Sequence, residues 1–162
     1  MPTVYRESRN IEASTIEYID HILDENDYTD VTVEKTFARV YSQDTPVVCI
    51  RVGDTEHPRA ELGSDQTIRK PVILVDIFAD SDAQRLDLKD LLIENLKKGW
   101  DFVEFIIADG EVESRGRNGR IIVLNLSESA VDLGIDKSSM LDKHDRYRHL
   151  ITLNCECSEV ED

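Results

Sequence analysis

Residues 72–99 read VILVDIFADSDAQRLDLKDLLIENLKKG, and this stretch decides the fold because it joins a strand pattern directly to a helix pattern. Residues 72–79 are apolar at almost every position, which is typical of a central strand buried on both faces. Ser81 and Gln84 fit the capping box of a helix N-terminus, and Gly99 is suited to follow the last helical turn. The leucines between these ends recur at three-and-four spacing. The stretch therefore predicts a buried strand followed by one amphipathic helix.

The flanking sequence adds elements on both sides of this strand and helix. Helical spacing over residues 11–25, after the N-cap candidate Asn10, predicts a first helix. The central strand is expected to extend over residues 67–79, with Pro71 near its start. Apolar patterns predict five further strands, at residues 31–41, 47–52, 100–108, 120–126 and 146–157. This order predicts an α+β fold, with a mainly antiparallel sheet of about six strands and two helices packed on one face.

The whole chain, residues 1–162, is predicted to form a single domain because no linker or internal repeat divides it. Flexible tails are expected at residues 1–9 and 158–162. A projecting loop is expected at residues 54–64, a long hairpin connection at 109–119 and an irregular insertion at 127–145. Two strands are expected to bury one face each, formed by Trp100, Phe102 and Ile106 in one strand and by Tyr147, His149, Ile151, Leu153, Cys155 and Cys157 in the other.

The charge balance is strongly acidic, with 34 Asp and Glu against 19 Lys and Arg and a net charge of -15. Such a surface repels phosphate, so we expect no general affinity for nucleic acid or for an anionic membrane. No apolar run approaches the ~20 residues of a membrane helix, and the first residues lack the apolar segment of a signal peptide. The sequence therefore predicts a soluble cytoplasmic protein with no membrane partner and with reduced cysteines.

Motifs for catalysis and for phosphate binding are absent from the sequence, including G-x-S-x-G, G-x-x-x-x-G-K-[ST] and G-x-G-x-x-G. The group His144, His149, Cys155 and Cys157 has spacings of five, six and two, which differ from the paired ligands of zinc modules. We therefore predict core or interface residues there, with no metal site, no cofactor and no enzymatic activity. Asp76 interrupts the central strand, and two interpretations stay open: a catalytic carboxylate with a raised pKa, or a structural position at an edge, on a wet face or in an ion pair with a neighbouring chain.

The few basic residues gather at loops and strand ends, where they can meet acidic patches of other protein copies. The alternative is ordinary solvated loop charge. As candidate protein-interface residues we identify three groups: His57, Arg59 and Arg69 around the first loop, next to Lys70; Arg115, Arg117 and Arg120 on the long hairpin; and Arg146 and Arg148, next to His149, at the start of the last strand.

The layout resembles the tail terminator (tail completion) proteins of long-tailed bacteriophages. The resemblance is carried by the quoted stretch up to Leu86, by the segment DRYRHLITL at residues 145–153 and by the first helix over residues 11–25. It covers most of residues 11–153 as a pattern rather than as an invariant motif. The long hairpin and the irregular insertion are larger than the family pattern needs.

The resemblance implies a structural virion protein of the tail or neck, assembled in the host cytoplasm. Such proteins form a hexameric ring on the completed tail tube, stop tube polymerisation and present the surface that joins the head connector. The implied partners are further copies of the chain, the tail tube protein and a head-completion or connector protein. Such proteins are not enzymes and bind no cofactor, and DNA passes through the ring without specific binding. We hypothesise that an acidic lumen assists this passage by repulsion.

Three other functions stay open. One is a related phage neck or head-completion protein. Another is a small acidic protein-binding module that mimics nucleic acid in a partner's basic groove, which needs carboxylates on one continuous face. The last is an enzyme that uses Asp76 or His149, for which the sequence offers no supporting motif.

Overall fold

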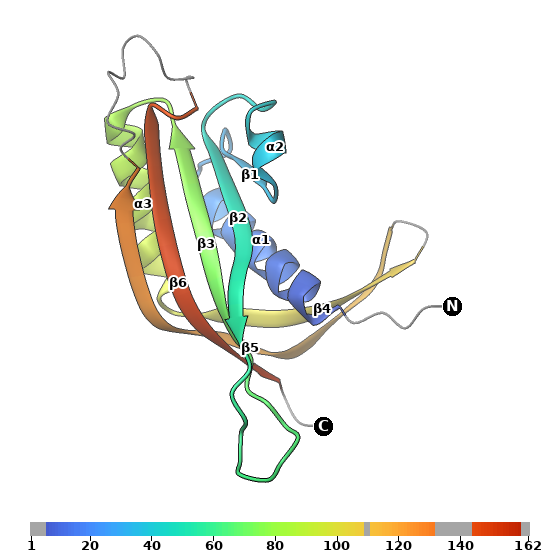
Figure 1. Ribbon diagram of the computed structural model, residues 1–162. Coiled ribbons are helices and arrows are strands. Elements are labelled where there is room, and N and C mark those ends of the chain that lie inside the picture. Colours follow the sequence, from blue (N-terminus) through green and yellow to red (C-terminus); the bar gives the residue numbers. More distant parts are fainter. Residues whose placement is uncertain (1–5, 109–110, 132–143, 160–162) are drawn as a thin grey trace.

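Two long helices cover one face of a six-stranded sheet in the computed structural model of the protein (Figure 1). The structure describes residues 6–108, 111–131 and 144–159, without the side chains of residues 37–38, 107–108, 112–114, 117–118 and 159. The elements are α1 (Glu7–Glu25), β1 (Thr32–Glu34), α2 (Phe37–Val40), β2 (Val47–Glu56), β3 (Lys70–Ala79), α3 (Asp82–Leu96), β4 (Trp100–Ala108), β5 (Glu111–Ala130) and β6 (Tyr147–Glu159).

The strand order in the sheet is β1-β2-β3-β6-β5-β4. β1 and β2 run parallel, whereas the other neighbouring pairs are antiparallel, so the sheet is mixed rather than purely antiparallel. The α+β class with two helices on one face is confirmed. The single turn of α2 is an addition that the sequence pattern did not predict. No described helix is long and apolar enough to cross a membrane.

The predicted start of α3 is confirmed by its hydrogen bonds. The Gln84 N–H donates to Ser81 Oγ at 3.2 Å, and the Asp80 N–H donates to Gln84 Oε1 at 2.7 Å. After α3, Gly99 has a φ of 72°, and a Cβ at this position would lie 2.5 Å from the carbonyl oxygen of Ile121. A glycine is therefore needed both for the left-handed conformation and for the close approach of β5.

The main core lies between the helices and the sheet. Leu88, Leu92 and Leu96 of α3 are fully buried, as the leucine spacing predicted. The predicted buried face of β6 is also confirmed, because every second side chain from His149 to Cys157 is buried. β3 and β6 are the two central strands of the sheet. α3 packs against these two strands, whereas α1 packs mainly against β4 and β2.

The predicted start of the first helix is wrong. α1 begins at Glu7, so part of the expected flexible tail is helical and Asn10 lies inside the helix. Asn10 is buried, and its Oδ1 accepts a hydrogen bond from the Phe105 N–H at 3.3 Å. The local preference of asparagine for an N-cap was overridden because a backbone group of a distant strand uses its side chain instead.

The predicted strand over residues 31–41 is also wrong in most of its length. β1 covers three residues, and the chain then turns into α2. Val40 at the end of α2 is fully buried with Val47, Cys49 and Phe78 in a second, smaller core. Burial of Val40 on the side of the sheet opposite α1 and α3 offsets the loss of strand pairing.

The strands on either side of the long hairpin extend further than the sequence predicted. β5 is 20 residues long and starts at Glu111, so most of the expected connection at 109–119 is paired with β4. Residues 127–130 belong to β5, while residues 132–143 of the expected insertion lie outside the described residues. Ile106 is 47% exposed and not on the buried face, because this hairpin extends away from the core (Figure 1).

Candidate protein-interaction surfaces

Residues 57–69 connect β2 to β3 as a folded arm that projects beyond the end of the sheet (Figure 1). Within the arm, the Ala60 N–H donates to the carbonyl oxygen of Gln66 at 2.9 Å. At its base, the Cys157 N–H donates to the carbonyl oxygen of Arg69 at 2.9 Å, which ties the arm to β6. The arm is therefore a hydrogen-bonded hairpin rather than an irregular loop.

The tip of the arm presents Leu62 to solvent, where its relative exposure is 105%. Arg59 fastens the tip, because its Nη1 donates to the Ser64 carbonyl oxygen at 2.6 Å and lies 3.7 Å from Asp65 Oδ1. Leu62 is not among the interface residues predicted from the sequence. The signal that identifies it is an isolated apolar residue within an otherwise polar, glycine-containing loop.

The other two residues of the first predicted group lie nearer the sheet. His57 is exposed at the start of the arm, and Arg69 is half-buried at its base. The structure therefore spreads His57, Arg59 and Arg69 along the arm and does not collect them into one basic patch.

The second predicted group lies on β5, within the paired hairpin and not on a loop. The Arg115 guanidinium is 5.7 Å from the centre of the Phe105 ring and forms an ion pair with Glu17 of α1. In the sheet register, Arg117 stands opposite Val103, and its side chain is outside the described residues. Arg115 therefore links the hairpin to α1.

Arg120 links β5 to the start of β4. Its Nη2 donates to the Lys98 carbonyl oxygen at 2.8 Å, and its Nη1 lies 3.5 Å from Asp101 Oδ1. Arg115 and Arg120 line one hollow of about 560 Å³ together with Lys98 and His21. The structure thus brings these two predicted interface arginines together, but each already has an acidic partner in the chain.

Asp76 lies between two arginines on the face of the sheet opposite α1 and α3. Its Oδ2 is 3.3 Å from Arg51 Nη2, and its Oδ1 is 3.3 Å from Arg148 Nε. The Asp76 side chain is 1% exposed, whereas those of Arg51 and Arg148 are 37% and 18% exposed. The Arg148 guanidinium also lies 4.8 Å from the centre of the Phe78 ring. Of the two interpretations of Asp76, this geometry favours a structural ion pair, formed within the chain.

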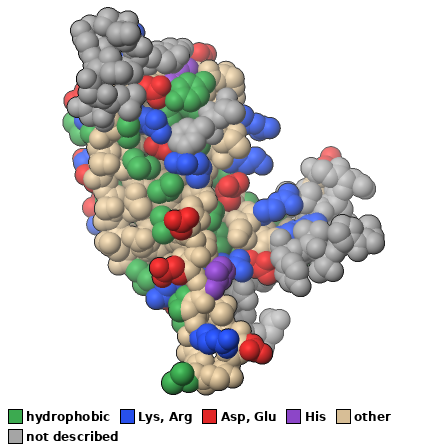
Figure 2. All heavy atoms as spheres, viewed as in Figure 1, with side chains coloured by type: hydrophobic (Ala, Val, Ile, Leu, Met, Phe, Trp, Pro, Cys, Tyr) green, Lys and Arg blue, Asp and Glu red, His purple; other side chains and the backbone are tan. Residues whose placement is uncertain are grey.

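The two faces of the molecule differ in charge. α1 and α3 carry ten carboxylates against three Lys and Arg residues. The face opposite α1 and α3 shows uncharged surface with scattered basic and acidic side chains in Figure 2, and one row of its register runs through Arg51, Leu74, Thr152 and Ser127. Arg146, the remaining predicted interface residue, is half-buried, and its Nε has no hydrogen-bond partner among the described residues. α1 and α3 together therefore carry a net charge of -7, close to half of the -15 of the chain.

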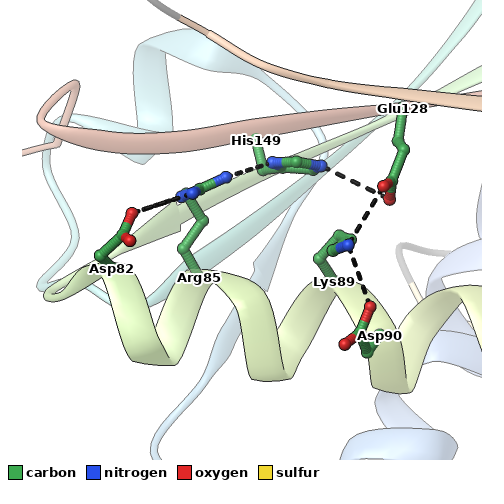
Figure 3. A network of polar contacts seen from close by, with 6 residues as sticks. All are labelled: Asp82, Arg85, Lys89, Asp90, Glu128 and His149. Carbon is green, nitrogen blue, oxygen red and sulfur yellow. Dashed lines mark hydrogen bonds and ion pairs between the residues drawn. The ribbon is translucent and has the colours of Figure 1, made fainter.

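A polar network joins α3 to β5 and β6 (Figure 3). His149 Nδ1 is 2.6 Å from Arg85 Nη1. Because arginine can only donate, Nδ1 is the acceptor and the neutral imidazole carries its proton on Nε2, which is 3.5 Å from Glu128 Oε2. Lys89 Nζ completes the network at 3.1 Å from Glu128 and 3.0 Å from Asp90.

Burial sets the protonation of this network. Burial lowers the pKa of His149, the positive charge of Arg85 lowers it further, and Glu128 opposes both effects. Hydrogen bonds to Asp90 and Glu128 raise the pKa of Lys89. The network therefore fastens α3 to the sheet with His149 neutral near pH 7.

The predicted His and Cys group is not assembled into one site. His144 Nε2 is 2.7 Å from the Gln43 carbonyl oxygen, whereas His149 contacts α3. No cluster of three or more metal-ligating side chains occurs in the described part of the chain. The three cysteines form no disulfide, and burial raises the pKa of Cys49 to about 11 and that of Cys155 to about 12.

The sequence matches no protein-family model and no curated protein. Three features of the molecule bear on its function: the folded arm, the β4–β5 hairpin and the net negative charge of α1 and α3.

Proposed function

We propose that the protein is a structural subunit of a bacteriophage tail, namely a tail terminator that forms a ring on the tail tube. The ring would end tube polymerisation and join the tail to the head connector. The observation that carries the proposal is an α+β body with two structured projections, the arm and the β4–β5 hairpin, which extend in different directions (Figure 1). The sequence resemblance to tail terminators adds to this support.

Two different projections suit a ring because a closed ring is built from heterologous contacts, in which one patch meets a different patch on the next copy. Projections also extend the reach of a subunit towards the tube below and the connector above. Arg59 on the arm and Arg115 on the hairpin, each more than half exposed, place cationic groups on an acidic molecule. Such groups can meet the carboxylates of neighbouring subunits.

The acidic helix layer supports the hypothesis that DNA passes the ring without binding. Ten carboxylates on α1 and α3 repel phosphate if this layer borders the passage. A structure of the ring tests the hypothesis directly. A passage lined with arginine and lysine would contradict it.

Electron microscopy of the purified protein mixed with tail tubes of its own phage tests the proposed function. We expect a ring at one end of each tube, together with tubes of limited length when polymerisation proceeds in its presence. A protein that neither forms rings nor alters tube length would contradict the proposal. Binding to the head connector without any effect on tubes would instead support a neck or head-completion protein.

One observation favours a second candidate, an acidic module that mimics nucleic acid. The two long helices lie on one face of the sheet, so their ten carboxylates share one layer of the molecule. Such a module would bind a basic nucleic-acid-binding protein and compete with its DNA or RNA. A competition assay with DNA and such a partner separates this candidate from the ring subunit, which is expected not to compete.

A further inference from the structure

The arm is a braced hairpin that could insert its tip into the surface of another protein. Its backbone is held by internal hydrogen bonds, and Arg59 braces the tip through the Ser64 carbonyl oxygen. Leu62, in the turn of the arm, is apolar and fully exposed. Beside it, Glu61 forms no ion pair within the described part of the chain. The tip therefore combines one exposed apolar side chain with one adjacent carboxylate.

A groove of about 390 Å³ lies along the N-terminal half of α1. Its apolar lining comes from Ala13 and Ile16 of α1 and from Phe105 of β4. We call it the α1 groove. Burial raises the pKa of Glu12 at its side, which indicates that the groove is partly shielded from water.

The rim of the α1 groove is richer in cations than the molecule as a whole. Arg6, Arg9 and Lys35 line it, and none of the three forms an ion pair with another described residue. The groove also contains three carboxylates, Glu12, Glu17 and Asp20, of which Glu17 is paired with Arg115. The positive charges of Lys35 and Arg9 act on Glu12 and lower its pKa, against the larger effect of burial. The rim therefore carries as many cations as carboxylates on an otherwise acidic protein, and these cations can attract a carboxylate from outside.

We propose that the arm of one copy docks on the next copy, with Leu62 in the α1 groove and Glu61 against its cationic rim. The apolar tip matches the apolar lining, and Glu61 would lie among the rim cations Arg6, Arg9 and Lys35, where it competes with Glu12 for Arg9 and Lys35. The contact is heterologous, so each copy supplies one arm and one groove and a series of copies can close into a ring. This inference rests on the self-assembly that the proposed function requires, and it names the surfaces that would perform it.

Complementation of two variants tests the contact. Leu62→Asp removes the arm function and keeps the groove, whereas Ala13→Arg fills the groove and keeps the arm. Light scattering coupled to size exclusion, over a concentration series, should show assembly of the wild type and monomers of each variant alone. An equimolar mixture should give a dimer of one copy of each variant, because one intact arm and one intact groove remain.

Leu86→Asp is the matched control, since Leu86 is another exposed leucine, at 40%, and lies on α3. It should assemble like the wild type. Circular dichroism establishes that each variant is folded. If Ala13→Arg fails to fold, Lys35→Glu replaces it, with rescue expected when Lys35→Glu is combined with Glu61→Arg in the same chain.

Three results would overturn the docking proposal: a wild type that stays monomeric at every concentration, Leu62→Asp that assembles like the wild type, or folded variants that remain monomeric when mixed. Capping of tail tubes is measured in a separate experiment. Assembly that depends on Leu62 without any capping of tubes contradicts the tail terminator function alone. Capping that survives Leu62→Asp contradicts the docking contact alone.

Discussion

Ser14 of α1 and Val103 of β4 exchange two hydrogen bonds although they are 89 residues apart in the chain. The Val103 N–H donates to Ser14 Oγ at 2.9 Å, and Ser14 Oγ donates to the Val103 carbonyl oxygen at 3.2 Å. One turn earlier in α1, Asn10 accepts from the Phe105 N–H. β4 is an edge strand, and unpaired edge groups invite pairing with other chains. α1 therefore satisfies part of this edge with its side chains.

Ser14→Ala is expected to lower the free energy of unfolding by about 1–3 kcal/mol, because it leaves the backbone groups of Val103 without their partner. Urea denaturation measures the change. Ser8→Ala is the matched control, since Ser8 is an exposed serine of the same helix. Equal effects of the two substitutions would contradict the role of Ser14 in closing the edge.

Asp76→Asn is expected to destabilise the protein by about 3 kcal/mol, because the substitution leaves Arg51 and Arg148 without the buried carboxylate between them. This value is at the low end for buried pairs since Arg51 is partly exposed. Asp87→Asn on the exposed surface of α3 should change stability by less than about 0.5 kcal/mol. A stable Asp76→Asn variant would mean that the two arginines are satisfied by other groups.

We predict that the free energy of unfolding depends on pH through His149. Its pKa is lowered in the folded state relative to about 6.5 in the unfolded chain, so the unfolded state binds the proton more tightly. Stability contributed by this site is complete above pH about 6.5 and falls as the pH drops below that value. Arg85 and Lys89 face the ring with positive charge, and Glu128 faces it with negative charge.

Unfolding free energies measured from pH 7 to pH 5 should fall more steeply for the wild type than for His149→Gln. An NMR titration should show protonation of His149 at a pH below about 6.5. Parallel pH profiles for wild type and variant would contradict the prediction.

Arg115→Glu combined with Arg117→Glu is expected to impair assembly and to leave the fold intact. The ion pair between Arg115 and Glu17 is about half exposed, and such pairs contribute about 0–1 kcal/mol. Circular dichroism reports the fold, and light scattering reports assembly. Adding Glu17→Arg should restore the link between hairpin and helix. Loss of folding in the double variant would show that the hairpin depends on these arginines for its structure.

The sequence by itself determined the elements whose signals are local. The capping residues Ser81 and Gln84, the leucine spacing of α3 and the alternation along β6 all act between neighbours in the chain, and each is confirmed by the structure. Hydrophobic periodicity and capping are short-range effects, so they can be identified without knowing what packs against them.

The tertiary structure alone decided which distant groups meet. It placed Asn10 inside α1 against Phe105, drew Val40 into a small second core and paired Asp76 with Arg51 and Arg148. It also gathered the carboxylates on the helix layer and set Leu62 apart at the end of the arm. These features depend on contacts between residues far apart in sequence, whose hydrogen bonds and burial override local preference.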